Sequence, residues 1–142
     1  MTPVNTDASS DATTEVVDIL LYSDDVTTRE QVQRAVGRRA AKDLPKIRWT
    51  EVATHGAVVR EAEQGGYALL ILDGESAKAG GMAVSKQLKN ELYQCPPVLV
   101  LTARPQDAWL AASCQADAVV QVPLDPIEIQ RVVAGFLRAQ EA

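Results

Sequence analysis

Three short apolar runs, each ending in or directly before a polar residue, most constrain the fold of this chain. The runs are Val16–Ser23 (VVDILLYS), Tyr67–Asp73 (YALLILD) and Val98–Thr102 (VLVLT). Nearly continuous apolar runs that are rich in β-branched residues are typical of parallel strands buried on both faces. Because such strands need helices over both faces of their sheet, the sequence predicts an α/β domain.

Two further strands and five helices complete the predicted fold. Ile47–Ala53 alternates apolar and polar residues, which indicates a half-exposed strand near a sheet edge, and Ala118–Val122 is a short final strand. The first predicted helix is capped by Thr27 or Thr28 and stopped by Lys42, Asp43 and Pro45. The next two are Ala57–Gln64 and Met82–Leu92, and a fourth begins at Pro105 and contains Trp109. The last is Ile127–Ala139, which is capped by Asp125–Pro126. This alternation predicts right-handed crossovers.

Length and charge limit the domain organisation and the partners. A chain of 142 residues fits one ordinary domain, and residues 1–14 are so polar that we expect a flexible tail before a domain at 15–142. A net charge of −5 argues against nucleic acid as a partner, because binding to a polyanion depends on clustered Lys and Arg. No run is long enough to span a bilayer and no secretory signal is present, so we expect a cytoplasmic protein without membrane insertion.

Residues that often carry catalysis or bind metals are few and isolated. Cys95 and Cys114 lack CxxC spacing and companion histidines, so buried reduced thiols are the expected state. His55 has no orienting partner in the sequence pattern. Gly80–Gly81 lies in no nucleotide-binding motif. We therefore expect a protein that is not an enzyme.

Four segments in order resemble the receiver domain of bacterial response regulators, over about Val16–Arg138. The segments are ILLYSDDVTTR, LLILDGESAKAGG, VLVLTAR and QADAVVQVPLDPIEI. The resemblance implies a flavodoxin-like, doubly wound, five-stranded parallel sheet of order 2-1-3-4-5 with five helices. Ligands of such sheets bind beyond the carboxyl ends of the strands.

The resemblance also implies roles for the polar residues at those strand ends. In receivers of two-component systems, one aspartate takes a phosphoryl group from a histidine kinase, while Mg²⁺ neutralises the transferring charge. By resemblance Asp73 is the phosphoacceptor and Thr102 is the hydroxyl that senses the phosphoryl group. Asp24, Asp73 and the backbone carbonyl of Glu75 would hold the metal ion.

The chain departs from the receiver pattern at three positions of the switch. Ser23 replaces the first of two acidic residues, which weakens the expected attraction for Mg²⁺. Val122 replaces a lysine, and the lost charge-assisted contact is worth roughly 1.5 to 3 kcal/mol. Val119 replaces an aromatic residue that rotates on activation. In a register slipped by one residue, Asp24 and Asp25 would instead form the acidic pair.

These departures favour an atypical receiver that binds a larger protein or complex, with phosphoryl switching weakened or lost. Trp49 and Trp109 are candidate interface anchors because tryptophan is enriched at binding hot spots, and ordinary partial burial is their alternative explanation. A second hypothesis is a working phosphorelay receiver that a histidine kinase phosphorylates on Asp73. A flavodoxin-like enzyme or nucleotide binder is a third, supported by fold analogy alone.

Overall fold

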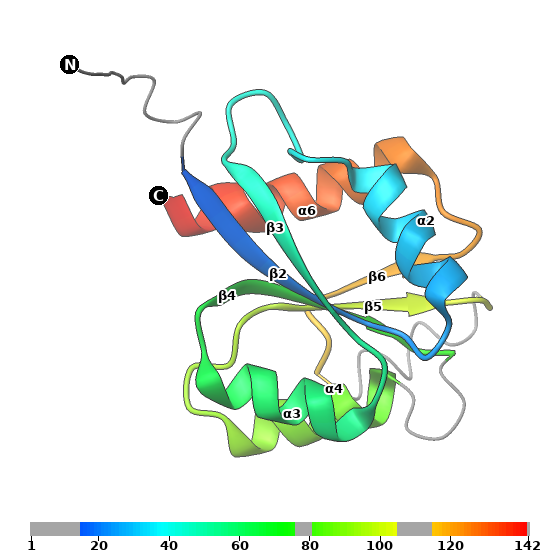
Figure 1. Ribbon diagram of the computed structural model, residues 1–142, viewed down its shortest axis with the longest axis vertical. Coiled ribbons are helices and arrows are strands. Elements are labelled where there is room, and N and C mark those ends of the chain that lie inside the picture. The colour runs from blue at the N-terminus through cyan, green and yellow to red at the C-terminus, as the bar shows by residue number, and fades with distance from the viewer. Residues whose placement is uncertain (1–14, 76–80, 105–114, 142) are drawn as a thin grey trace.

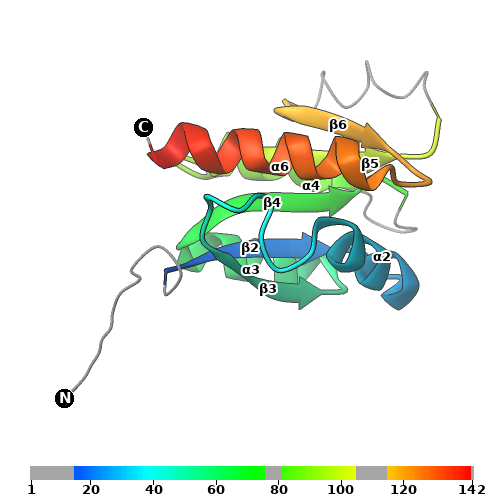
Figure 2. The same ribbon diagram turned by 90° about the horizontal axis from the view of Figure 1, so that it is seen from above.

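One parallel sheet organises the chain. The structure, a computed structural model, describes residues 15–75, 81–104 and 115–141. The strands of the described residues are β2 (Val16–Tyr22), β3 (Lys46–Val52), β4 (Tyr67–Asp73), β5 (Val98–Thr102) and β6 (Ala118–Gln121). They pair in parallel in the order β3-β2-β4-β5-β6, and Figure 2 shows them side by side and pointing the same way. This confirms the predicted 2-1-3-4-5 order.

Helices cover both faces of this sheet. Those of the described residues are α2 (Val26–Val36), α3 (His55–Gln64), α4 (Gly81–Glu91) and α6 (Pro126–Glu141). Figure 1 shows α2 and α6 on one face and α3 and α4 on the other. The predicted tail at residues 1–14 and the predicted helix that begins at Pro105 lie outside the described residues.

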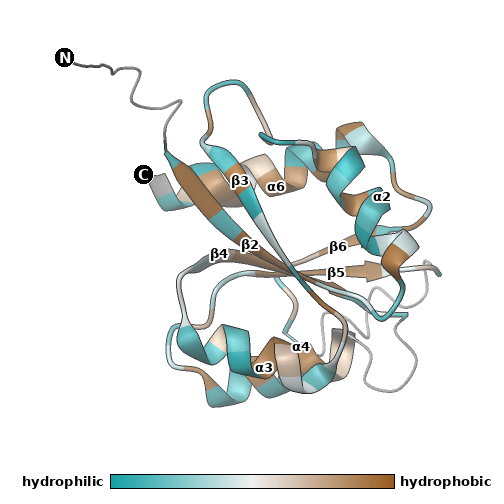
Figure 3. Cartoon of the chain, in the orientation of Figure 1, coloured by the Kyte–Doolittle hydropathy of each residue, from teal (hydrophilic) through white to brown (hydrophobic). Residues whose placement is uncertain are grey.

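The core consists of two apolar layers, one on each side of the sheet. Ile19 and Leu21 of β2 pack toward α2 and α6, whereas Leu20 packs toward α3 and α4. Because side chains alternate along a strand, a strand that is covered on both faces must be apolar at every position. The central strands are brown in Figure 3, and the buried residues of β4 and β5 confirm the prediction of doubly buried strands.

The limits of α2 differ from the prediction at both ends. Asp25, rather than Thr27 or Thr28, caps the helix, since its Oδ1 accepts a hydrogen bond from the Thr27 N–H at 2.9 Å. The helix ends at Val36, before the predicted stop at Lys42, because Gly37 takes a φ of 84°. Aspartate is a stronger cap than threonine, and glycine adopts the left-handed conformation without steric cost.

The two outer strands and the start of α6 follow the prediction closely. β3 lies at the edge, and β6 ends one residue before Val122, which forms a cis peptide bond with Pro123. Asp125 caps α6 as predicted, with its Oδ1 accepting from the Ile127 N–H at 3.0 Å. Among the described residues, no helix is both long enough and apolar enough to cross a membrane.

Candidate functional site

The strand register brings the predicted site residues to one edge of the sheet. Asp73, the last residue of β4, pairs with Leu101 of β5, and Thr102 follows directly as the last residue of β5. Ser23 follows β2, the neighbour of β4 on its other side. Val122 follows β6, and its N–H donates a hydrogen bond to the Thr102 carbonyl at 2.8 Å. Residues far apart in the sequence thus meet at the carboxyl ends of four strands.

A hydrogen bond between Ser23 and Asp73 lies at the centre of this edge. The Ser23 Oγ donates to Asp73 Oδ2 at 2.7 Å, and both residues are buried, with exposed fractions of 0% and 6%. The same hydroxyl accepts from the Asp25 N–H at 3.0 Å, and the Glu75 N–H donates to Asp73 Oδ1 at 2.8 Å. A buried carboxylate is tolerated only when it is hydrogen-bonded, and here a hydroxyl and a backbone amide supply the two bonds.

Replacing this hydroxyl should destabilise the fold. We expect Ser23→Ala to lower the free energy of unfolding by about 1 to 3 kcal/mol, because the buried Asp73 carboxylate loses a donor. Denaturant unfolding of both proteins measures the difference. The control repeats the substitution in an Asp73→Asn background, where the lost contact is no longer charge-assisted and the effect should shrink. An equal loss in both backgrounds would show that Ser23 acts elsewhere.

Glu75 links the ends of β4 and β5 through its side chain. Its exposed carboxylate accepts a hydrogen bond from the Ala103 N–H, with 3.1 Å between Oε2 and the nitrogen. Its own N–H is bonded to Asp73, so one residue connects the predicted phosphoacceptor to the backbone just after Thr102. The family resemblance points only to the Glu75 carbonyl, and nothing in the sequence indicates this side-chain contact.

Thr102 carries an unused polar group. Its side chain is fully buried, and within the described part of the chain its Oγ1 has no hydrogen-bond partner. Buried hydroxyls are usually bonded because losing water without compensation costs free energy. The end of β5 therefore keeps a donor and acceptor that a ligand or a rearranged neighbour can use.

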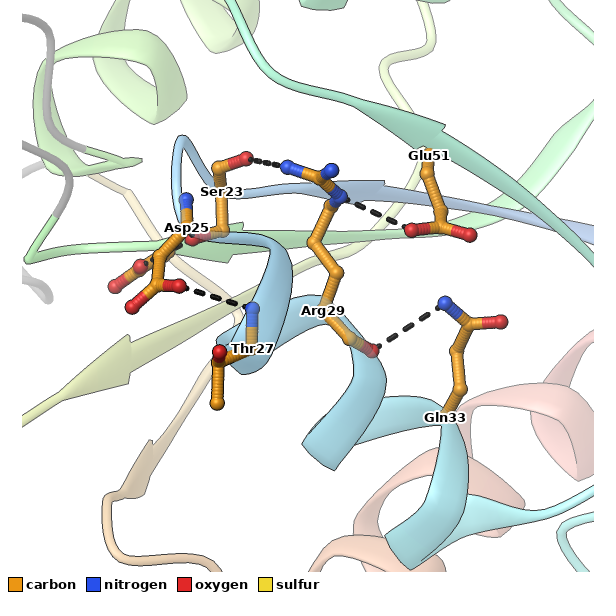
Figure 4. Close-up of polar contacts among 7 residues, drawn as sticks. Ser23, Asp25, Thr27, Arg29, Gln33 and Glu51 are labelled. Carbon is orange, nitrogen blue, oxygen red and sulfur yellow. Dashed lines mark hydrogen bonds and ion pairs between the residues drawn. The ribbon is translucent and has the colours of Figure 1, made fainter.

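Arg29 fixes the carboxyl end of β2, as Figure 4 shows. Its Nη1 donates to the Ser23 carbonyl at 2.6 Å, and its Nε pairs with Glu51 Oε1 at 3.0 Å. Hydrogen bonds from Gln33 and Arg29 lower the pKa of the Glu51 carboxyl below its ordinary value. This guanidinium is therefore engaged by a backbone carbonyl and a carboxylate, and it holds the Ser23 backbone in place.

The donor set at this edge fits a magnesium ion less well than an acidic pair would. Mg²⁺ prefers carboxylate and carbonyl oxygens in near-octahedral arrangement. Asp24 is exposed, and Ser23 offers a hydroxyl that already donates to Asp73. Across residues 15–75, 81–104 and 115–141, no group of three or more His, Cys, Asp or Glu side chains is arranged to hold a metal ion.

The side chains of the remaining predicted residues that the structure describes pack elsewhere or serve other roles, although the Val122 backbone lies at this edge. Val119 is half-buried against the layer under α3 and α4, and Val122 is half-buried against the layer under α2 and α6. Trp49 is also half-buried and packs against that second layer from the edge strand. Asp25 is used as the cap of α2, and Trp109 lies outside the described residues.

Comparison with known proteins finds relatives by sequence in two strains of Mycobacterium tuberculosis. An uncharacterized response regulatory protein of Mycobacterium tuberculosis, found in strains H37Rv and CDC 1551, is 54% identical over 121 residues. These residues make up 85% of this chain and 91% of that protein. No protein-family model matches the chain.

Solved structures share the fold at low sequence identity. A two-component response regulator from Clostridium difficile superposes with a TM-score of 0.73 at 16% identity, covering 89% of this chain and 99% of that one. The signal receiver domain of a signal transduction histidine kinase from Syntrophus aciditrophicus gives 0.71 at 22% identity, covering 87% and 91%. A probable two-component system response regulator/GGDEF domain protein gives a TM-score of 0.73 at 18% identity. The superposition covers 89% of this chain and 51% of that longer protein.

Proposed function

The chain belongs to the response regulator family as a receiver domain, and from that premise we propose that it is an atypical receiver that binds a protein partner, with phosphoryl switching weakened or lost. Receiver domains are signalling domains of two-component systems and not enzymes. The observation that carries the proposal is the 2.7 Å hydrogen bond from Ser23 Oγ to Asp73 Oδ2. It pairs the predicted phosphoacceptor with a neutral hydroxyl at the position where an acidic residue is expected.

Phosphoryl transfer needs positive charge, and of the described residues neither Val122 nor Arg29 offers a free one to this edge. The transferring group carries negative charge, and catalysis consists mainly of positioning it and stabilising that charge. Val122 has no ammonium to offer and packs against the core. Arg29 is bonded to the Ser23 carbonyl and to Glu51, so using it would require breaking both contacts. These features support slow or absent phosphorylation of Asp73.

We also propose that any bound Mg²⁺ is held weakly by Asp24, Asp73 and the carbonyl of Glu75. When bound, the ion would supply charge neutralisation. The cap hydrogen bond from the Thr27 N–H to Asp25 supports Asp24, rather than the slipped pair of Asp24 and Asp25, as the ligand after β2. The Ser23 hydroxyl adds no negative charge beside it.

The partner that we propose is a larger protein or protein complex. The net charge of −5 disfavours nucleic acid, because binding to a polyanion depends on clustered Lys and Arg. Two surfaces are candidates: α6 with β6 and the segment that contains Trp109, or the β3 edge near Trp49. The position of β3 as the outer strand of the described sheet supports the second, and the half-burial of Trp49 leaves part of this residue for contact.

A working phosphorelay receiver is the second candidate function. The buried, unpartnered Oγ1 of Thr102 favours it, because a phosphoryl oxygen on Asp73 would give that hydroxyl a hydrogen-bond acceptor. In this case a histidine kinase would phosphorylate Asp73, and the acyl phosphate would hydrolyse slowly.

Intact-mass measurement separates the two functions. The purified protein and its Asp73→Asn variant are incubated with Mg²⁺ and acetyl phosphate. We expect wild type to carry far less than one phosphoryl group per chain, because neither Ser23 nor Val122 stabilises the transferring charge. A stoichiometric adduct on wild type that Asp73→Asn abolishes would establish the phosphorelay function instead.

A further inference from the structure

We propose that Glu75 is the residue that keeps oxyanions out of this site, by placing its own carboxylate on the backbone amide of Ala103. This inference deepens the weakened switching proposed above and rests on it for its functional meaning. The contact itself, 3.1 Å between Glu75 Oε2 and the Ala103 nitrogen, is independent of whether Asp73 is ever phosphorylated.

The position of the Ala103 amide makes it the natural donor for an anion at Asp73. Asp73 ends β4 beside Leu101 of the neighbouring β5, and Ala103 comes two residues after Leu101. Exposed backbone N–H groups at the ends of strands and in turns are good donors for anions. For an oxyanion attached to Asp73, this amide therefore lies at the end of the neighbouring strand β5.

The Glu75 side chain of the same protein already accepts a hydrogen bond from this amide. Its N–H is bonded to Asp73 Oδ1, which fixes its backbone next to the predicted phosphoacceptor. From there its side chain reaches the Ala103 amide. Because the carboxylate belongs to the same chain, it binds the amide without the loss of translational entropy that a free anion would incur. One N–H serves one strong acceptor at a time, and bonds to an ionised acceptor are stronger than neutral ones.

An incoming oxyanion thus meets two obstacles at the same residue. It must displace the Glu75 carboxylate from the amide, and it must approach a negative charge that stays tethered nearby. Because Glu75 is exposed, the displaced side chain can move into water, so the barrier is moderate and not absolute. Glu75 therefore determines how well the site discriminates against anions.

The test compares two variants with a matched control. Glu75→Ala removes the acceptor, Glu75→Gln keeps its shape without the charge, and Glu63→Ala removes an exposed carboxylate on α3, away from the site. Binding of beryllofluoride with Mg²⁺, a phosphoryl analogue, is titrated for each protein. We expect Glu75→Ala to bind about three- to ten-fold more tightly than wild type, Glu75→Gln to gain less, and Glu63→Ala to be unchanged.

A second measurement needs no ligand. The amide resonance of Ala103 and its hydrogen-exchange rate should change in Glu75→Ala and stay the same in Glu63→Ala. An unaltered Ala103 amide together with unaltered analogue affinity in Glu75→Ala would overturn this proposal, whatever the level of phosphorylation. Stoichiometric phosphorylation of wild type would instead refute weakened switching while leaving the amide result intact, so the two failures are distinguishable.

Discussion

Gly74→Ala is expected to lower the free energy of unfolding by about 2 to 3 kcal/mol. A Cβ at this position would lie 2.6 Å from the Leu101 carbonyl oxygen and 3.2 Å from Cγ1 of Val100. The same carbonyl accepts a hydrogen bond from the Gly74 N–H at 2.8 Å. Relief of the clash must therefore move the backbone of β5 or break a contact that joins it to β4.

Thermal and denaturant unfolding measure this effect, with Gly135→Ala as the matched control. Apart from its chain neighbours and the nearby backbone of α6, a Cβ at Gly135 meets no described atom within 4 Å. The residue lies inside α6, where alanine is favoured over glycine by about 0.5 to 1 kcal/mol. The control should be slightly more stable than wild type, whereas Gly74→Ala should melt roughly 10 °C lower. Equal stability of wild type and Gly74→Ala would show that the strand ends separate without cost.

The strands were predictable because their burial leaves little freedom in the sequence. Tyr67–Asp73 and Val98–Thr102 have the predicted limits, since a strand covered on both faces must be apolar along its whole length. The edge strand was found from its alternation, because the strand is only partly covered and Ile47 is its one buried residue. The strand order followed from the family resemblance and was confirmed by the sheet pairing.

The limits of α2 and the contacts of the site were less predictable. The choice of Asp25 over Thr27 as cap depends on where β2 ends, which side-chain type alone does not determine. Ser23 was interpreted only as a lost charge, and its hydrogen bond to Asp73 depends on the pairing of β2 with β4. The contact of Glu75 with Ala103 joins residues 28 positions apart, which spacing in the sequence does not reveal.

Restoring both lost groups should produce the largest functional change. We expect Ser23→Asp combined with Val122→Lys to accept a phosphoryl group on Asp73 from acetyl phosphate at least about ten-fold faster than wild type. The lysine would add a charge-assisted contact of roughly 1.5 to 3 kcal/mol in the transition state, and about 1.4 kcal/mol corresponds to a factor of ten in rate. Intact mass against time, with Mg²⁺ present, measures the rate.

The single Ser23→Asp variant tests whether a second carboxylate at this edge strengthens Mg²⁺ binding. It places a second carboxylate against the buried Asp73 and removes the hydroxyl that bonds it, so it should be less stable than wild type without Mg²⁺. Added Mg²⁺ should recover much of that stability, because an ion that binds only the folded state stabilises it by mass action. Wild type, with one charge fewer at this edge, should show a smaller Mg²⁺-dependent rise in melting temperature.

Two controls show whether the gain comes from the intended groups. Val122→Met in the Ser23→Asp background adds length without charge, and Asp73→Asn in the double variant removes the acceptor. Neither should form the adduct at the rate of the double variant. If Ser23→Asp with Val122→Lys reacts no faster than wild type, then Ser23 and Val122 do not limit the switch. The tethered Glu75 carboxylate, which holds the Ala103 amide, would then be the remaining obstacle, and adding Glu75→Ala to the double variant would test it directly.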